Sequence, residues 1–212
     1  AHRRGCLVQD NKGTLSLYPW SASAPRTFGA PVATVGLCAK ELWAVRGQQA
    51  EPLLAATAVA PVSVGAKVTA LAVGRRWLVV GRRDGTLGLV DRRGKPARVA
   101  FEDTPASPVL HLALGAAGTV AAGFGDGTVG LWNLASGRRL AASRLHGAVQ
   151  VLVLRDGRLH AASELGDALS WDLRALDMPY CQLLKRVWER VPVVWRQGRA
   201  VLQPPPTAHR CR

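Results

Sequence analysis

Four stretches of the chain are apolar at nearly every position. Each begins with a valine, and their starts lie 36, 41 and 40 residues apart, at residues 32–37, 68–73, 109–114 and 149–154. Runs of β-forming residues of this length are typical of strands that are buried on both faces. A regular period of about 40 residues indicates a repeated structural unit. The pattern therefore predicts four copies of one β-rich unit.

Each of these strands is followed, after a short polar turn, by a second apolar strand. The second strands are predicted at residues 42–45, 77–80, 119–122 and 159–162. In two repeats a tight turn, Asp84-Gly85 or Asp126-Gly127, then leads to a third strand, at 86–90 or 128–132. Asp-Gly favours the positive backbone angles of a two-residue hairpin. The repeat is therefore expected to be antiparallel.

The third strand is less regular in the other repeats. An earlier copy at 14–18 follows Lys12-Gly13, and a looser copy at 168–171 follows Gly166. Residues 48–61 form the weakest segment, because the turn at Gly47 leads into no convincing third strand.

Four short antiparallel strands repeated every forty-odd residues resemble the WD-repeat family. The likeness is carried by Trp132-Asn133 and Trp171-Asp172, with Val90-Asp91 and Tyr18 at equivalent places. In that family each repeat forms one four-stranded blade of a β-propeller. The resemblance covers about residues 5–175 and implies an all-β fold with about four to five blades. Rings of this family most often have seven blades, so it also implies that these blades belong to a larger ring.

The family's supporting hydrogen-bond set is mostly eroded in this sequence. His146 and Trp171 are candidates for such a set; His146 lies just before the last of the four apolar stretches, which we call the apolar ladders. Ala122 and Val80 stand where the resemblance leads us to expect a hydroxyl. We therefore expect the blades to be held mainly by apolar packing.

The opening blade starts with a second strand, at residues 5–9, and lacks a first one. An unpaired strand edge is an aggregation hazard, so we expect it to be covered. An upstream segment of the same protein, or a second polypeptide, is the expected source. A hairpin predicted at 191–202 is the competing source. The chain has no initiator methionine, and we expect it to be part of a longer protein.

The periodicity changes after Asp172, which separates propeller blades at 1–175 from a tail at 176–212. Asp177 and Pro179 are interpreted as a helix cap and a first-turn proline, and the helix is expected near 178–190. Apolar residues then recur at helical spacing, at Tyr180, Leu183, Leu184, Val187, Trp188 and Val191. A basic terminus follows the hairpin. The apolar stripe predicts either a helix packed on the propeller or a docking helix for a partner domain.

The formal net charge of +14 favours nucleic acid, anionic lipid or acidic proteins as partners. Five arginine pairs are scattered along the chain, and most of them fall in predicted loops, which favours solvated loop charges. Isoleucine is absent and arginine far outnumbers lysine, a bias typical of a GC-rich, bacterial genome. The candidate interaction surface comprises Lys67, Arg82, Arg83, His146, Lys185, Arg186, Trp188, Arg190, Arg196 and Arg199.

The cysteines and histidines offer little chemistry. The four cysteines form no CxxC pair, so reduced thiols in a cytoplasmic protein are expected. A zinc site built from His2, Cys6, His209 and Cys211, or a nucleophilic pair on Cys181, is permitted by residue type but fixed by no spacing. No phosphate-binding glycine loop or paired-carboxylate motif occurs. We expect no enzyme activity, cofactor or metal in this chain.

Two functions remain open. The resemblance implies a protein-recognition, scaffold or sensor module of a larger bacterial signalling or defence protein, beside a catalytic domain such as a peptidase, kinase or ATPase. The alternative is nucleic-acid binding by the C-terminal segment, where basic residues surround Trp188 and Trp195. The helical periodicity instead favours core positions for both tryptophans. Protein recognition is the preferred interpretation, and no membrane association is expected.

Overall fold

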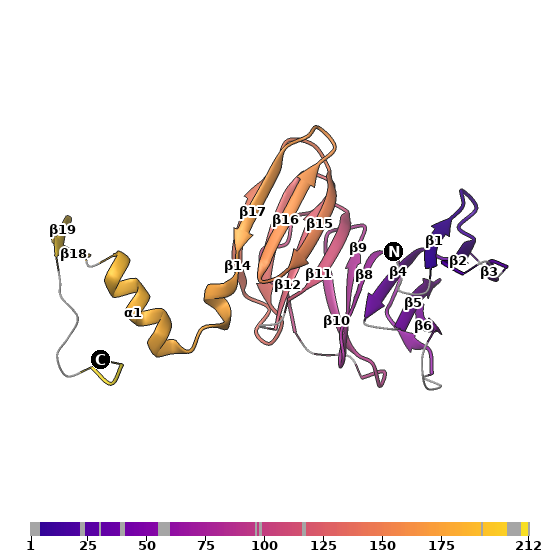
Figure 1. Ribbon diagram of the computed structural model, residues 1–212, viewed down its shortest axis with the longest axis horizontal. Coiled ribbons are helices and arrows are strands. Elements are labelled where there is room, and N and C mark those ends of the chain that lie inside the picture. Colours follow the sequence, from indigo (N-terminus) through magenta and orange to yellow (C-terminus); the bar gives the residue numbers. More distant parts are fainter. Residues whose placement is uncertain are drawn as a thin grey trace. The chain divides into compact units, whose positions relative to one another are not determined.

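The computed structural model describes residues 5–21, 24–29, 31–38, 41–54, 60–95, 97, 99–115, 118–191, 193–202 and 209–211. The chain divides into two compact units (Figure 1). We call Ala1–Trp171 the propeller unit and Asp172–Arg212 the tail unit.

The first two sheets of the propeller unit contain seven strands that pair in chain order. The pairings are antiparallel. The first sheet consists of β1 (Gly5–Gln9), β2 (Leu15–Pro19) and β3 (Arg26–Phe28). The second consists of β4 (Thr34–Cys38), β5 (Glu41–Arg46), β6 (Gln49–Leu54) and β7 (Val62–Ser63).

Three further sheets complete the described part of the propeller unit. The third sheet consists of β8 (Val68–Val73), β9 (Trp77–Arg82) and β10 (Leu87–Asp91). The fourth consists of β11 (Val109–Leu114), β12 (Thr119–Phe124), β13 (Thr128–Asn133) and β14 (Arg139–Arg144). The fifth consists of β15 (Val149–Arg155), β16 (Arg158–Ser163) and β17 (Ala168–Asp172). The predicted all-β blades are confirmed, and the four apolar ladders are β4, β8, β11 and β15.

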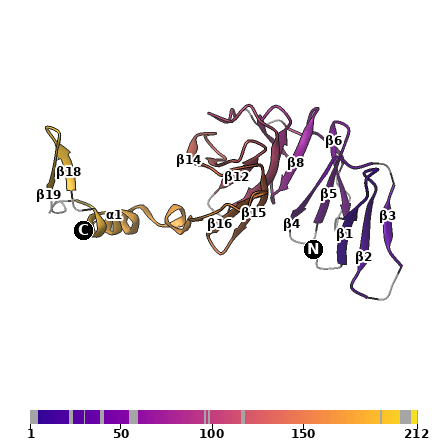
Figure 2. The same cartoon turned by 90° about the horizontal axis from the view of Figure 1, so that it is seen from above.

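The ladder strands are also the strands through which neighbouring sheets meet. β4 contacts β8, β8 contacts β11, and β11 contacts β15. Figure 2 shows the sheets of this unit following one another in chain order. β8, which has a neighbouring sheet on each side, is buried at nearly every position, as expected from its apolar sequence. The expected burial on both faces is wrong for β15, where Val151 and Val153 are 47% and 46% exposed.

Two details of the predicted strands are wrong. Residues 49–54 form a regular third strand, β6, which tolerates Pro52 because the pairing shifts register beside its partner Trp43. The Asp84-Gly85 turn is not a hairpin with two positive angles, because only Gly85 takes a positive φ, of 89°. The Asp84 carboxylate instead accepts a hydrogen bond from the Thr86 N–H at 3.0 Å.

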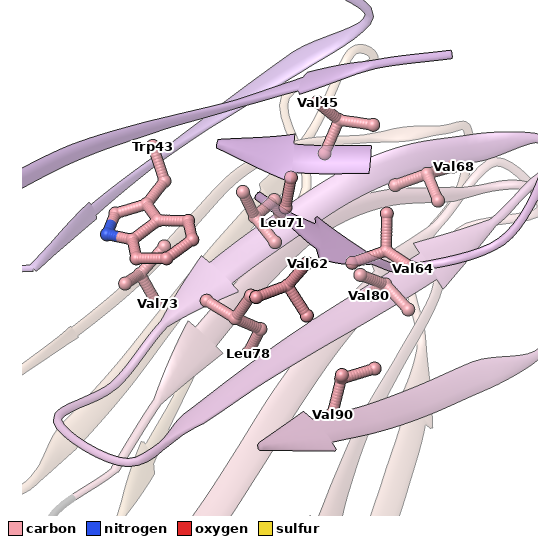
Figure 3. Close-up of a cluster of buried hydrophobic side chains, with 11 residues drawn as sticks. Trp43, Val45, Val62, Val64, Val68, Leu71, Val73, Leu78, Val80 and Val90 are labelled. Carbon is pink, nitrogen blue, oxygen red and sulfur yellow. The ribbon is translucent and has the colours of Figure 1, made fainter. Parts of the chain in front are cut away.

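The core lies between successive sheets. Figure 3 shows the cluster between the second and third sheets, where Trp43, Leu78 and Val80 are fully buried. The next cluster, between the third and fourth sheets, is centred on Phe124 and Trp132, whose rings meet edge-on at 6.0 Å. The Trp132 indole donates to the Glu102 carbonyl oxygen at 2.7 Å. Apolar packing therefore dominates, as expected from the eroded polar set.

A glycine in the second strand of a blade lies against the valine that opens the next blade. Gly81 of β9 faces Val109, and Gly123 of β12 faces Val149, and both valines are fully buried. A methyl group added to Gly123 would lie 2.6 Å from a Val149 methyl group, and the site at Gly81 is tighter. The absence of a side chain at these two positions therefore sets how closely neighbouring blades approach.

We predict that Gly81→Ala lowers the free energy of unfolding by about 1–3 kcal/mol, the usual cost of overpacking a well-packed core. Urea unfolding followed by tryptophan fluorescence measures the change. Gly29→Ala is the matched control, because no atom lies within 4 Å of the added methyl group. Equal stability of the two variants would show that the Gly81–Val109 contact does not set the spacing.

The tail unit contains the predicted helix and hairpin. A 3₁₀ helix, η1 (Arg174–Asp177), precedes α1 (Tyr180–Arg190), and β18 (Val193–Arg196) pairs with β19 (Arg199–Leu202). The expected Asp177 cap is wrong, because Asp177 ends η1 and the residue before α1 is Pro179, with no side-chain cap hydrogen bond. None of the residues of α1 is fully buried. No helix in the described part of the chain is long and apolar enough to cross a membrane.

A disulfide joins Cys181 on α1 to Cys211 near the C-terminus. The expectation of reduced thiols is therefore wrong for this pair, while Cys6 is a free, exposed cysteine. No motif marks the pair, because 30 residues separate the two cysteines. The bond holds the basic terminus beside the helix, where the His209 ring meets the edge of Trp188 at 5.3 Å.

We predict that reduction of this disulfide destabilises the tail unit by about 2–4 kcal/mol, because an unfolded chain without the link gains loop entropy. Hydrogen exchange of the α1 amides, with and without dithiothreitol, measures the loss. The exchange of β12, in the propeller unit, serves as the internal control. Unchanged protection of α1 would show that its stability does not depend on the bond.

The outer edge of β1 carries no strand among the described residues, since β1 pairs with β2 alone. The third blade has three described strands. Its fourth strand is indicated by a hydrogen bond from the Ala97 N–H to the Leu89 carbonyl oxygen. The hairpin that was the competing partner for β1 forms a separate two-stranded sheet, β18–β19.

Candidate functional site

The turns of the propeller unit fall into two sets at opposite ends of its strands. One set joins first to second and third to fourth strands. The other joins second to third strands and each blade to the next. Turns of the same set are hydrogen-bonded to one another. In the first set the Arg92 N–H donates to the Arg76 carbonyl oxygen at 3.0 Å, and in the second set the Arg83 N–H donates to the Lys67 carbonyl oxygen at 3.0 Å. Each set therefore forms one face.

The first face carries a concentration of positive charge. We call it the basic turn face; the cations on its described turns and strand ends are Arg26, Arg75, Arg76, Arg92, Arg93, Lys95, Arg138, Arg139, Arg155 and Arg158. The acids on the same turns and strand ends are Glu41, Asp91 and Asp156, and Glu102 and Asp103 are bonded to the turn that carries Arg138 and Arg139. On the opposite face the charges are more balanced, with Lys12, Arg46, Lys67, Arg82, Arg83, Arg144 and His146 among Asp10, Asp84, Asp126, Glu164 and Asp167. The excess charge is therefore a property of one face.

Within the basic turn face, two turns of the third blade line an open surface pocket of about 510 Å³. We call it the arginine pocket, and its lining residues are Arg75, Arg76, Asp91, Arg92 and Arg93. Arg75 and Arg76 belong to the turn between β8 and β9, and Arg92 and Arg93 follow β10. Pairing of β10 with β9 places the two turns side by side.

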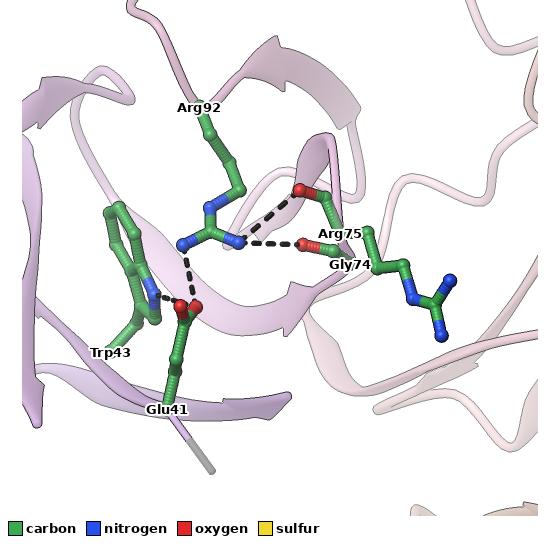
Figure 4. A network of polar contacts seen from close by, with 5 residues as sticks. All are labelled: Glu41, Trp43, Gly74, Arg75 and Arg92. Carbon is green, nitrogen blue, oxygen red and sulfur yellow. Dashed lines mark hydrogen bonds and ion pairs between the residues drawn. The ribbon is translucent and has the colours of Figure 1, made fainter. Parts of the chain in front are cut away.

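Arg92 is held by the neighbouring blade (Figure 4). Its guanidinium forms an ion pair with the Glu41 carboxylate at 2.5 Å and lies 4.9 Å from the Trp43 ring centre. It also donates to the carbonyl oxygens of Gly74 and Arg75, at 3.5 and 3.2 Å. The Arg92 and Glu41 side chains are 16% and 24% exposed, so solvent screens the pair only in part. Arg92 thus links the second and third blades.

Arg76 is paired within its own blade. Its Nε lies 3.3 Å from the Asp91 carboxylate, and its guanidinium covers the Trp77 ring at 4.5 Å. The hydrogen bond from the Arg93 N–H holds the pKa of Asp91 below its ordinary value, and Arg76 adds to this against the opposing effect of desolvation. Asp91 is therefore ionised at neutral pH and neutralises Arg76.

Arg75 and Arg93 are the remaining cations of the pocket. Both side chains are exposed, and neither guanidinium forms a hydrogen bond or ion pair with a described residue. Because Arg76 is balanced by Asp91 and Arg92 by Glu41, these two groups carry the net positive charge of the pocket.

The predicted surface residues of the propeller unit lie on the opposite face. Lys67, Arg82 and Arg83 come together at the far end of the third blade, where Arg82 donates to the Val64 carbonyl oxygen at 3.2 Å. His146 belongs to the fifth blade, and its Nδ1 lies 2.6 Å from the Asp167 carboxylate. His146 thus takes part in a polar link between a blade entry and a hairpin turn, as its expected place in the eroded set suggested.

The other predicted surface residues belong to the tail unit. Lys185, Arg186, Trp188 and Arg190 lie on α1, and Arg196 and Arg199 lie on the β18–β19 hairpin. Trp188 is partly buried against His209. The interpretation of Trp195 as a core residue is wrong, because 78% of its surface is exposed.

Of the residues considered for a zinc site, Cys211 is bonded to Cys181, and His2 lies outside the described residues. Among the residues that the structure describes, no group of three or more His, Cys, Asp or Glu side chains is placed to hold a metal ion.

The basic turn face was missed because the arginine pairs look scattered along the sequence. Arg75-Arg76, Arg92-Arg93 and Arg138 lie at the same end of the strands, although 62 residues separate the first from the last. The sequence shows which two strands of the repeat each of these turns connects. Assigning each turn to one end by counting strands from the preceding apolar ladder would have found the face.

Comparison with solved structures identifies the class of protein. The designed protein Ika4 superposes with a TM-score of 0.58 at 18% identity, over 69% of this chain and 93% of the design. A chain of the mitotic checkpoint complex gives 0.64 at 17% identity, over 80% of this chain and 62% of its own. BamB from Moraxella catarrhalis gives 0.57 at 18% identity, over 82% and 56%. The fold is that of a β-propeller.

These likenesses extend to the fold alone. No protein-family model matches the chain, and no curated protein matches its sequence. The chain spans 62% of the mitotic checkpoint chain and 56% of BamB. Because one fold serves many functions, what this propeller binds has to be argued from its own surface.

We predict that Glu41→Gln lowers the free energy of unfolding by about 1–3 kcal/mol, because Arg92 then keeps its partly buried position without a carboxylate partner. Chemical denaturation measures the change. Asp156→Asn is the control: its ion pair with Arg155 is more than 80% exposed on both sides, and its loss is expected to cost less than about 0.5 kcal/mol. A cost at Asp156 as large as that at Glu41 would contradict a special role for the Glu41–Arg92 link.

Proposed function

We propose that the chain is a protein-recognition and scaffold module of the WD-repeat kind, and that its basic turn face binds an acidic surface of a protein partner. The observation that carries the proposal is the collection of unbalanced arginines at one end of the blades. Complementary charge steers association and selects partners of opposite sign. A rigid propeller suits this role, because it presents turns from several blades as one surface.

The partner in this proposal is a catalytic domain, such as a peptidase, kinase or ATPase, that belongs to the same bacterial signalling or defence protein or associates with it. The chain itself contributes recognition, without chemistry or cofactor. The arginine-rich, isoleucine-free composition supports a GC-rich bacterial source.

A cytoplasmic location is part of the proposal, and the Cys181–Cys211 disulfide is the feature in tension with it, because disulfides are rare in reducing compartments. Alkylation of free thiols at the moment of cell lysis tests this part. Labelling of both cysteines supports the cytoplasm. Protection of both cysteines would contradict the cytoplasmic location and indicate an oxidising compartment.

A second candidate function is binding of single-stranded nucleic acid by the tail unit. It is favoured by Trp195, which is 78% exposed on a hairpin that also carries Arg196 and Arg199. An exposed aromatic ring beside arginines is suited to base stacking and phosphate contact.

Site-specific photo-cross-linking in the host cell distinguishes these functions. A photoreactive residue replaces Arg138 or Arg158 on the basic turn face, Gln48 on the opposite face, or Trp195 in the tail. We expect protein adducts from the basic turn face, at segments rich in Asp and Glu. The yield should fall when the lysate is irradiated at about 1 M salt, where the screening length is about 3 Å.

Equal protein adducts from Gln48 would contradict recognition by the basic turn face. Adducts with nucleic acid from Trp195, without protein adducts from Arg138 or Arg158, would favour the second candidate.

A further inference from the structure

The arginine pocket is more specific than a generally basic surface requires. We infer that it is a binding site for a phosphate monoester carried on a serine or threonine side chain of the protein partner. This inference rests on the proposed function, since it takes the partner to be a protein and names the group that the pocket recognises.

The charge balance of the pocket matches a phosphoryl group. Four arginines of the pocket, Arg75, Arg76, Arg92 and Arg93, are balanced by the two carboxylates of Asp91 and Glu41, so the pocket has a net charge of about +2. A phosphorylated side chain carries about −1.5 to −2 at neutral pH. A single carboxylate would balance only half of this net charge.

The chemistry of the two cations points the same way. A guanidinium presents a planar fork of N–H donors that matches the oxygens of phosphate in a bidentate manner. Arg75 and Arg93 belong to two different turns and line the same pocket. Three acceptor oxygens on a phosphate can satisfy both forks, whereas a carboxylate offers two.

The backbone that carries these cations is held in place before any ligand binds. Arg76, next to Arg75, is fixed by Asp91 and the Trp77 ring. Arg92, next to Arg93, is fixed by Glu41 and the Trp43 ring. The two turns are thus fixed, which lowers the ordering cost of binding to that of two side chains.

The size of the pocket fits a phosphorylated side chain with its neighbours. A volume of about 510 Å³ is within the range of ligand sites, about 300–1,000 Å³. It exceeds what one phosphoryl group fills, which leaves room for the side chain that carries the group and for an adjacent residue.

The same arrangement disfavours a nucleic-acid strand. Nucleic-acid grooves combine phosphate contacts with aromatic rings that stack on bases. Here the Trp77 ring is covered by Arg76 and the fully buried Trp43 ring by Arg92, so neither is open to a base.

Titration of the full chain with short synthetic probes tests the inference. The probes are a glycine-flanked phosphoserine pentapeptide, the same peptide with Glu or Ser at that position, inorganic phosphate, and a single-stranded oligonucleotide. Backbone amide shifts of Arg75 and Arg93 in ¹H–¹⁵N spectra report the site and the dissociation constant. We expect the phosphopeptide to bind about tenfold more tightly than the Glu peptide, and the Ser peptide not to bind.

The variants are matched in charge. Arg75→Gln with Arg93→Gln should weaken phosphopeptide binding about tenfold or more, and Arg75→Lys with Arg93→Lys should restore part of it, because lysine keeps the charge but loses the fork. Lys67→Gln with Arg83→Gln removes the same charge from the opposite end of the same blade and should change the affinity less than about twofold. Thermal unfolding of each variant confirms that it is folded.

Other results overturn the inference in distinguishable ways. Equal binding of the Glu and phosphoserine peptides would leave an acidic-surface site without phosphate selectivity. Inorganic phosphate binding as tightly as the peptide would assign the pocket to a small phosphorylated molecule. Tighter binding of the oligonucleotide, lost in the Arg75/Arg93 variant, would assign it to nucleic acid. Failure of the phosphopeptide together with acidic protein adducts at Arg138 would overturn this inference alone and leave the proposed function standing.

Discussion

The packing of a bare glycine backbone against the opening valine of the next blade is the contact on which the propeller unit depends. Val109 fills the space beside Gly81, and Val149 fills the space beside Gly123. The Thr69 hydroxyl adds a polar link between the same blades, because it donates to the Val109 carbonyl oxygen at 2.7 Å. These glycine–valine contacts join the second strand of one blade to the first strand of the next, and they hold the third, fourth and fifth blades against one another.

Alignment of the blades is also what concentrates the charge. Turns of the same rank in each repeat come to the same end, so arginines that are far apart in sequence share one face. The paired arginines have a second role there, because Arg92 bonds to Glu41 of the neighbouring blade while it lines the pocket. The arginine that holds two blades together therefore adjoins Arg93, one of the two arginines proposed to bind the ligand. A ligand bound in the pocket would therefore lie next to the Arg92–Glu41 contact between the second and third blades.

The sequence-based predictions were accurate for features that depend on residues close together in the chain, and they failed for features that depend on distant residues. The apolar ladders, the tail helix and its hairpin depend on local periodicity and turn residues, and the structure has them near the predicted positions. The strand at residues 49–54 was missed because Pro52 is tolerated only through a register shift opposite Trp43, which no local pattern reveals. The Cys181–Cys211 disulfide was missed because it joins distant residues that no motif connects.

The sequence by itself determined the repeat, its strand order and the excess of positive charge. These properties follow from side-chain alternation and from composition, which need no knowledge of what lies beside each strand. Only the tertiary structure decided which arginines share a face and which are paired with Asp91 and Glu41. The reason is physical: whether a charge is balanced depends on neighbours a few ångströms away in space, and for Arg92 that neighbour is 51 residues away in the chain.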